Sequence, residues 1–142
     1  MDSELRSLLG GEFPEPEDIP GRYIFGICLK DRLIGWLELF DVRTRSGSAE
    51  LRIGIGERWA WNQGYGRQAV RQAVEYAFRS LKLKVVYLRV LLTNRRAVRC
   101  YLGSGFQKSG VLRAGHRRVE GHQSLLLMEI HRHQVSEPGL AL

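Results

Sequence analysis

The spacing of apolar residues changes once near the middle of the chain, and this change limits the folds that the chain can adopt. From Ala49 to Ile55 every second residue is apolar, which is the pattern of a half-buried strand. From Ala69 to Leu81 apolar residues recur at steps of three and four, which is the pattern of an amphipathic helix. The glycine-containing segment Gln63–Gly66 lies between the two patterns. The sequence therefore predicts a strand, a loop and a long helix at the centre of the fold.

Further strands are expected on both sides of this unit. They are predicted at Arg22–Leu29, Leu33–Val42, Val85–Leu92, Phe106–Leu112 and Ser124–Ile130. The first two are joined by a short polar turn, which favours a hairpin. Asn94 can cap a second, shorter helix that ends before the glycines at 103 and 105. We therefore predict a mixed α/β (α+β) fold, in which a mostly antiparallel sheet is flanked by helices.

The length of 142 residues fits one domain. We expect an acidic N-terminal segment at residues 1–21, in which 3–9 form a short helix, a domain at 22–131 and a loose tail at 132–142. No apolar run reaches the ~20 residues that span a bilayer, and the acidic start lacks the pattern of a secretory signal. These features predict a cytoplasmic protein without a membrane partner.

The chain is basic, with 22 Lys and Arg against 15 Asp and Glu and a formal net charge of +7. This balance suits an anionic partner, which could be nucleic acid, a membrane surface or a phosphorylated cofactor. Cys28 and Cys100 form no disulfide framework or metal-binding spacing. We expect both to be small buried hydrophobic side chains, and no metal site.

The segment Gln63–Ala69 has the composition of an anion site. Glycines at the start of a helix let the backbone approach a ligand closely, and the first helical N–H groups have no partner within the helix. Together with the helix dipole, these groups suit a pyrophosphate. Arg67 and Arg71 lie one turn apart and could add positive charge.

A Rossmann dinucleotide site is the main competing interpretation, because Gly64, Gly66 and Ala69 fit its loose glycine pattern. That motif requires a tight turn between strand and helix, whereas residues 56–63 separate them here. The next strand ends in Leu91–Asn94, which offers no acidic residue for a ribose. Both features count against a Rossmann site.

Over roughly Tyr23 to Ile130 the sequence resembles the GNAT acetyltransferases, in particular the branch with ribosomal-protein N-terminal, spermidine and antibiotic acetyltransferases. The resemblance is carried by the strand Ala49–Gly54, the glycine segment Gln63–Ala69 and the block Thr93–Phe106. It implies acetyl-CoA as cofactor and transfer of an acetyl group to a primary amine. The acceptor would be a protein N-terminus, a polyamine or an antibiotic-like small molecule.

The resemblance also implies the residues of the site. Asn94 is expected to contact the pantetheine arm or the acetyl end, and Tyr101 to approach the thioester sulfur. A tyrosine hydroxyl, with an ordinary pKa of about 10, suits a proton donor to a departing thiolate. The strand backbone could bind a developing oxyanion. The full set of expected cofactor-binding residues is Ile53, Ile55, Gln63, Gly64, Tyr65, Gly66, Arg67, Gln68, Arg71, Asn94 and Ala97.

For the general base, Glu50 is the first candidate and Glu38 the second, although either could be a plain surface carboxylate. His116 and His122 could serve an acceptor, but histidines in loops are usually only solvated. We expect direct transfer to the amine rather than an acetylated Cys100, because no neighbour in sequence supplies the base that a nucleophilic cysteine needs.

Family members normally begin with an extra strand and one or two helices, whereas only about twenty residues precede Tyr23. We therefore expect the usual first strand and helix to be missing, and the exposed sheet edge to favour a homodimer. A CoA-binding regulator without catalysis is a second interpretation of the sequence. A basic RNA-binding module is the third, supported only by Trp59 and Trp61 beside Arg58. We expect these tryptophans to flank the cofactor loop instead, with no nucleic-acid partner.

Overall fold

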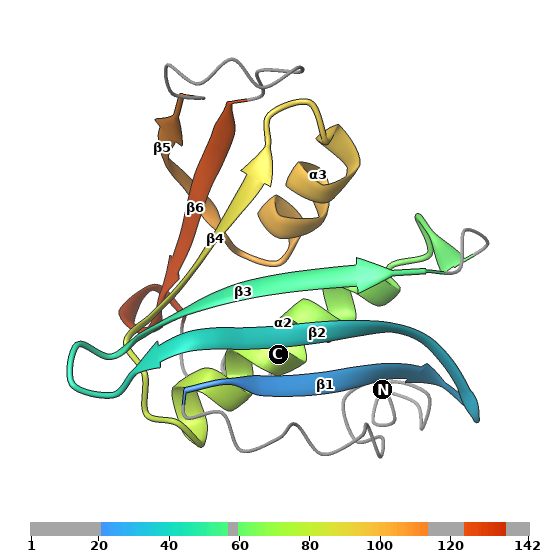
Figure 1. Cartoon of the computed structure of the whole chain (residues 1–142), viewed down its shortest axis with the longest axis horizontal. Coiled ribbons are helices and arrows are strands. Elements are labelled where there is room, and N and C mark those ends of the chain that lie inside the picture. Colours follow the sequence, from blue (N-terminus) through green and yellow to red (C-terminus); the bar gives the residue numbers. More distant parts are fainter. Residues whose placement is uncertain (1–20, 57–59, 114–123, 136–142) are drawn as a thin grey trace.

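The computed structural model describes residues 21–56, 60–113 and 124–135. Strands and helices follow one another along them in the predicted order (Figure 1). The elements are β1 (Tyr23–Leu29), β2 (Arg32–Arg43), β3 (Ser48–Ile55), α2 (Tyr65–Arg79), β4 (Val85–Leu91), α3 (Arg95–Gly103), β5 (Gln107–Leu112), β6 (Leu125–His131) and the short 3₁₀ helix η2 (Arg132–Gln134). This arrangement confirms the predicted mixed, mostly antiparallel sheet with flanking helices. The expected helix at residues 3–9 lies outside the described residues.

The described strands form one sheet in the order β1-β2-β3-β4-β6-β5. Every neighbouring pair is antiparallel except β3 and β4, which run parallel. That parallel pairing covers only Ser48–Glu50 on β3 and Val85–Tyr87 on β4. Beyond these residues the two strands separate, and Figure 1 shows the two halves of the sheet diverging from that point. The separation opens the sheet at its centre.

Helix α2 packs on β2, β3 and β4 and buries the apolar stripe that its sequence predicts. The buried residues of the helix are Ala69, Val70, Ala73, Val74, Ala77 and Phe78. Ala49, Leu51, Val86 and Leu88 are buried in the same core. Because side chains alternate along a strand, Glu50 and Arg52 of β3 point to the opposite face of the sheet. One face is therefore covered by α2, and the other carries charged side chains.

Two smaller expectations needed correction. The tail does not become irregular at residue 132, because η2 continues the ordered chain to Gln134. Neither Cys28 nor Cys100 is in a disulfide, and each is half-buried rather than fully buried. Among the residues the structure describes, no group of three or more His, Cys, Asp or Glu side chains could hold a metal ion. In the same residues no helix is long and apolar enough to cross a membrane.

Candidate active-site cleft

A cleft of about 750 Å³ lies where β3 and β4 separate. Its walls come from the second half of β3, the loop before α2, the first turn of α2, the end of β4 and helix α3. These segments are far apart in sequence, and the short β3–β4 pairing brings them together. The cleft is therefore a direct consequence of the fold.

The backbone of β3 points into this cleft at alternate residues. The N–H of Gly56 donates to the carbonyl of Ile34 at 3.0 Å, so Gly56 faces β2. The preceding carbonyl, of Ile55, faces the other way and accepts a hydrogen bond from the indole N–H of Trp61 at 2.9 Å. Ile53 lies two residues earlier and points in the same direction as Ile55. Main-chain groups of Ile53 are thus available to a ligand between the strands.

The first turn of α2 forms the second wall. Gly64 is the N-cap residue and adopts a left-handed conformation with φ of 85°, which glycine reaches without steric cost. No side chain caps this helix, and its first turn carries no acidic residue. The first N–H groups therefore have no intrahelical partner, and the positive end of the helix dipole is not neutralised. This combination favours an anion at the cleft.

Arg67 and Arg71 both reach toward the C-terminal end of α3. The guanidinium of Arg67 lies against Gly103, so closely that a Cβ there would be 2.4 Å from Nη2. Arg71 donates to the carbonyl of Gly103 at 3.1 Å. Arg67 also lines the cleft, whereas Arg71 does not. Only the first of the two arginines is therefore placed to contact a ligand directly.

Helix α3 contributes Asn94 and Tyr101. The side-chain oxygen of Asn94 accepts from the N–H of Ala97 at 3.2 Å, which confirms its role as a helix cap and leaves its amide N–H groups to donate into the cleft. Tyr101 is only 7% exposed and packs edge-on against Phe106. Burial raises the pKa of Tyr101 well above its ordinary value, and the neighbouring Cys100 adds to the rise.

Tyr101 lines the cleft. Its hydroxyl makes no hydrogen bond within the described part of the chain, and no fully buried side-chain N or O atom there lacks a partner. Both observations fit a hydroxyl that opens toward the cavity. Cys100 lines the same cavity, and burial raises the pKa of its thiol despite the nearby Arg67. The cleft thus favours neutral over anionic forms of both groups.

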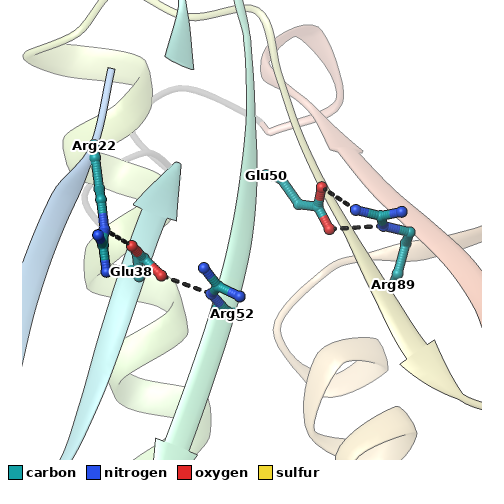
Figure 2. A network of polar contacts seen from close by, with 5 residues as sticks. All are labelled: Arg22, Glu38, Glu50, Arg52 and Arg89. Atoms are coloured by element: carbon teal, nitrogen blue, oxygen red, sulfur yellow. Dashed lines mark hydrogen bonds and ion pairs between the residues drawn. The ribbon is translucent and has the colours of Figure 1, made fainter. Parts of the chain in front are cut away.

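Both candidate bases are engaged in ion pairs on the face opposite α2 (Figure 2). The two oxygens of Glu50 accept from Nε and Nη2 of Arg89 at 2.9 and 3.0 Å. Glu38 accepts from Arg52 at 2.6 Å and from Arg22 on its other side. Neither carboxylate lines the cleft, although Arg52 and Arg89 do.

The structure brings most of the predicted site together. The predicted residues that line the cleft are Ile53, Ile55, Gly64, Gly66, Arg67, Asn94, Ala97 and Tyr101. Gln63, Tyr65, Gln68, Arg71 and Glu50 do not line it, and their roles stay predictions. Tyr65 instead packs on the hydrophobic core. His116, His122, Trp59 and Arg58 lie outside the described residues.

Sequence reasoning missed several lining residues. Arg96 stacks on the ring of Trp61 with its guanidinium carbon 3.7 Å from the ring centroid, which ties α3 to the loop before α2. Arg52, Arg89 and Arg99 also line the cleft. Trp61, which lies beside the glycine segment in the sequence, could have indicated a contact at this loop. The arginines come from separate elements, and only the three-dimensional fold shows that they converge.

Comparison with known proteins identifies a family with which this fold and cleft agree. A family model described as an acetyltransferase (GNAT) domain matches residues 3–107, which includes most of the acidic N-terminal segment. Spermidine N(1)-acetyltransferase of Vibrio cholerae is 35% identical over 80 residues, covering 56% of this chain and 46% of the relative. A Bacillus subtilis protein named Probable N-acetyltransferase YjcK is 35% identical over 105 residues, covering 72% and 58%. The chain spans about half the length of the curated relatives it matches.

A solved structure shares the fold. The crystal structure of spermidine N-acetyltransferase from Vibrio cholerae in complex with CoA and spermine superposes with a TM-score of 0.73 at 28% identity. The match covers 80% of this chain and 67% of that one. With the family model spanning residues 3–107, the chain belongs to the GNAT acetyltransferase domain family.

Proposed function

We propose that this protein is an acetyl-CoA-dependent N-acetyltransferase that moves an acetyl group directly to a primary amine. One observation carries the proposal: the β3 backbone, the uncapped start of α2 and the Tyr101 hydroxyl converge on one cleft. The names of its relatives, which are N-acetyltransferases, support the same activity. The acceptor class is a protein N-terminus, a polyamine or an antibiotic-like small molecule.

The residues of the cleft fit acetyl-CoA. The uncapped first turn of α2, with Gly64, Gly66 and Arg67, would hold the pyrophosphate, because it offers free N–H groups and positive charge without an acidic neighbour. The edge of β3 at Ile53 would hydrogen-bond the pantetheine arm, whose amides need partners of this kind. Asn94 can donate from its side-chain amide while it caps α3. The cleft volume of about 750 Å³ is large enough for the arm of such a ligand.

When bound, acetyl-CoA supplies an acetyl thioester, whose sulfur leaves with a proton as the new amide bond forms. Tyr101 would supply that proton, because burial keeps its hydroxyl protonated. Burial also raises the pKa of the neighbouring Cys100 thiol, so this part of the cleft disfavours a bare thiolate. A thiolate that departs here would therefore take up a proton, and Tyr101 is the proposed donor.

The amine must lose a proton, and Glu50 is the proposed base. Both oxygens of Glu50 already accept from Arg89, so Glu50 can take a proton only by giving up one of these bonds or through water. If it acts as base, Glu50→Gln lowers kcat at neutral pH and loses less as the pH rises, because the amine then deprotonates without help. Glu75→Gln is the control, because Glu75 pairs with Arg79 on α2 and does not line the cleft. Loss of thermal stability without a change in the pH profile would assign Glu50 a structural role.

We further propose that the protein works in the cytoplasm, as a homodimer and without a nucleic-acid partner. Support for association comes from β1, which has a neighbouring strand on one side only within the described residues. A related protein, the spermidine N-acetyltransferase of Vibrio cholerae, has a solved dodecameric structure.

A thiol-release assay with acetyl-CoA over a panel of peptides, polyamines and aminoglycosides tests the activity. The expected result is thiol release that depends on one class of amine and yields a product heavier by one acetyl group. Binding of CoA without turnover on any amine would favour the regulatory alternative. Absence of CoA binding would contradict both.

A further inference from the structure

The cleft is lined from both faces of the sheet, and its side on each face is called a mouth below. On the side of α2, its walls are the start of that helix and the side chains of Leu51 and Val90, which are buried against the helices. On the opposite face, its walls include Arg52 and Gly54 from β3 and Arg89 and Leu91 from β4. These alternate with the buried positions along each strand. A cofactor whose phosphates occupy the α2 mouth leaves the opposite mouth to the acceptor.

Arginine, rather than carboxylate, is exposed at this second mouth. The side chains of Glu38 and Glu50 are 3% and 8% exposed, whereas those of Arg52 and Arg89 are 55% and 46% exposed. The guanidinium groups are therefore the exposed members of these ion pairs, whose contacts Figure 2 shows. Counting Arg22, this cluster holds three positive and two negative groups, so it keeps a net positive charge.

All charged side chains in the described lining of the cleft are positive. Its arginines are Arg52, Arg67, Arg89, Arg96 and Arg99, and no described lining residue is Asp or Glu. The exposed Asp41 and the half-buried Glu129 lie beside Tyr87, where β3 and β4 are still paired. A polycation that entered the second mouth would meet like charges there, which is unfavourable.

Both arginines at the mouth still have donors to offer. The Nε of Arg52 donates a hydrogen bond to Glu38, and no described carboxylate accepts from its two terminal nitrogens. Nε and Nη2 of Arg89 donate to Glu50, and Nη1 donates to no described carboxylate. A guanidinium with free terminal N–H groups binds a carboxylate by charge-assisted hydrogen bonds. Trp36, whose ring lies against Gly54, is 40% exposed, and the lining residue Leu91 is 38% exposed, so this mouth also offers apolar surface.

We propose, resting on the acetyl transfer proposed above, that the acceptor amine carries a carboxylate, which Arg52 and Arg89 bind at this mouth. Polyamines are then poor acceptors for this chain, in contrast to the relatives named for spermidine. The arginines are specificity determinants, and they discriminate by the charge at the far end of the acceptor. The acceptor class follows from the sign of the charge around the opening.

Matched acceptors of equal length test this proposal. The probes are γ-aminobutyrate, its carboxamide and putrescine, followed by δ-aminovalerate, its carboxamide and cadaverine, with spermidine alongside. Each series keeps a primary alkyl amine and changes only the group at the other end. We expect kcat/KM to be highest for a carboxylate, by on the order of tenfold over its carboxamide, and lowest for the diamine.

Arg52→Gln is the informative variant, because Glu38 keeps its ion pair with Arg22 when Arg52 is removed. It should reduce the advantage of the carboxylate over the carboxamide by about tenfold and leave the carboxamide rate nearly unchanged. Arg79→Gln is the control, since Arg79 is an exposed arginine of α2 that pairs with Glu75 and does not line the cleft. It should leave both rates unchanged.

Equal or higher kcat/KM for the diamines would overturn the carboxylate proposal and leave the acetyltransferase proposal standing. Loss of carboxylate and carboxamide rates together in Arg52→Gln would also overturn it, because that pattern indicates a structural role. Absence of turnover with every acceptor, despite CoA binding, would refute the proposed activity and this inference with it.

Discussion

Tyr101 is largely buried beside Cys100, lines the cleft and is held in its protonated form. Tyr101→Phe keeps the ring that packs on Phe106 and removes only the proton donor. We expect kcat to fall by ~10²–10⁴-fold while the Kd for acetyl-CoA changes little, because the contribution arises in the transition state. Steady-state kinetics and calorimetry measure the two quantities.

Tyr76→Phe is the matched control, because Tyr76 packs against Tyr23 and Phe25 and does not line the cleft. A loss of only a few fold in Tyr101→Phe would mean that water or the amine proton protonates the sulfur. Tyr101 would then be an ordinary core aromatic.

The raised pKa of Tyr101 also predicts that the free energy of unfolding depends on pH. The folded state binds the Tyr101 proton more tightly than the unfolded state, whose tyrosines ionise near the ordinary value of 10.0. The stabilisation is complete below that pH and is lost as the pH rises above it. Urea unfolding from about pH 8 to about pH 11 should show a fall in the free energy of unfolding that is shallower in Tyr101→Phe. An identical slope in both proteins would contradict the burial of this hydroxyl.

Cys100 lines the cleft but should not carry the acetyl group. Burial raises the pKa of its thiol, so at neutral pH the reactive thiolate is scarce. Cys100→Ala should keep most of the activity, measured by thiol release. Mass spectrometry that traps an acetylated Cys100, together with its competent turnover by the amine, would refute direct transfer.

At the scale of single elements, the sequence predicted nearly every strand and helix to within one or two residues. Hydrophobic period decides these elements locally: alternation for β1 to β3, steps of three and four for α2, and an unbroken apolar run for β4. Gly64, which must adopt a positive φ, also marks the start of α2 in the sequence.

The ion pairs and part of the cleft lining could not be predicted from the sequence. Glu50 and Arg89 are 39 residues apart and meet only because β3 and β4 are neighbours. The contact of Arg96 with Trp61 depends on how α3 packs against the loop before α2. Within the glycine segment, the spacing of residues does not predict which side chains face the cleft. In the structure Tyr65 packs on the core, whereas Arg67 points toward α3. Tertiary packing selects among neighbours that look equivalent in sequence.

The start of α2 depends on the backbone conformation of Gly64. Its φ of 85° is strained for any side chain, so Gly64→Ala should lower the free energy of unfolding by about 1 kcal/mol, although no atom crowds the new Cβ. Gly56→Ala is the control, because Gly56 also has open space and no positive φ. Equal stability of the two variants in thermal unfolding would contradict this account of the turn.

At the scale of the whole molecule, the described sheet ends at β1 with one edge that has no neighbouring strand among the described residues. An open edge with free N–H and C=O groups favours pairing with a second copy. We expect light scattering at micromolar concentration to give the mass of a dimer. The mass of a monomer over the same range would contradict self-association.

The central claim is that the opening between β3 and β4 holds acetyl-CoA against the start of α2. A Cβ at Gly66 would lie 3.4 Å from Sγ of Cys100 and 3.5 Å from Cδ1 of Ile55, so the fold tolerates it, but the larger side chain of valine would occupy the cleft. Gly110→Val on β5 is the control, because nothing lies near its Cβ. Calorimetric titration with acetyl-CoA should show one site per chain in the wild-type protein and in Gly110→Val, and no binding in folded Gly66→Val. Unchanged affinity in Gly66→Val would contradict the claim.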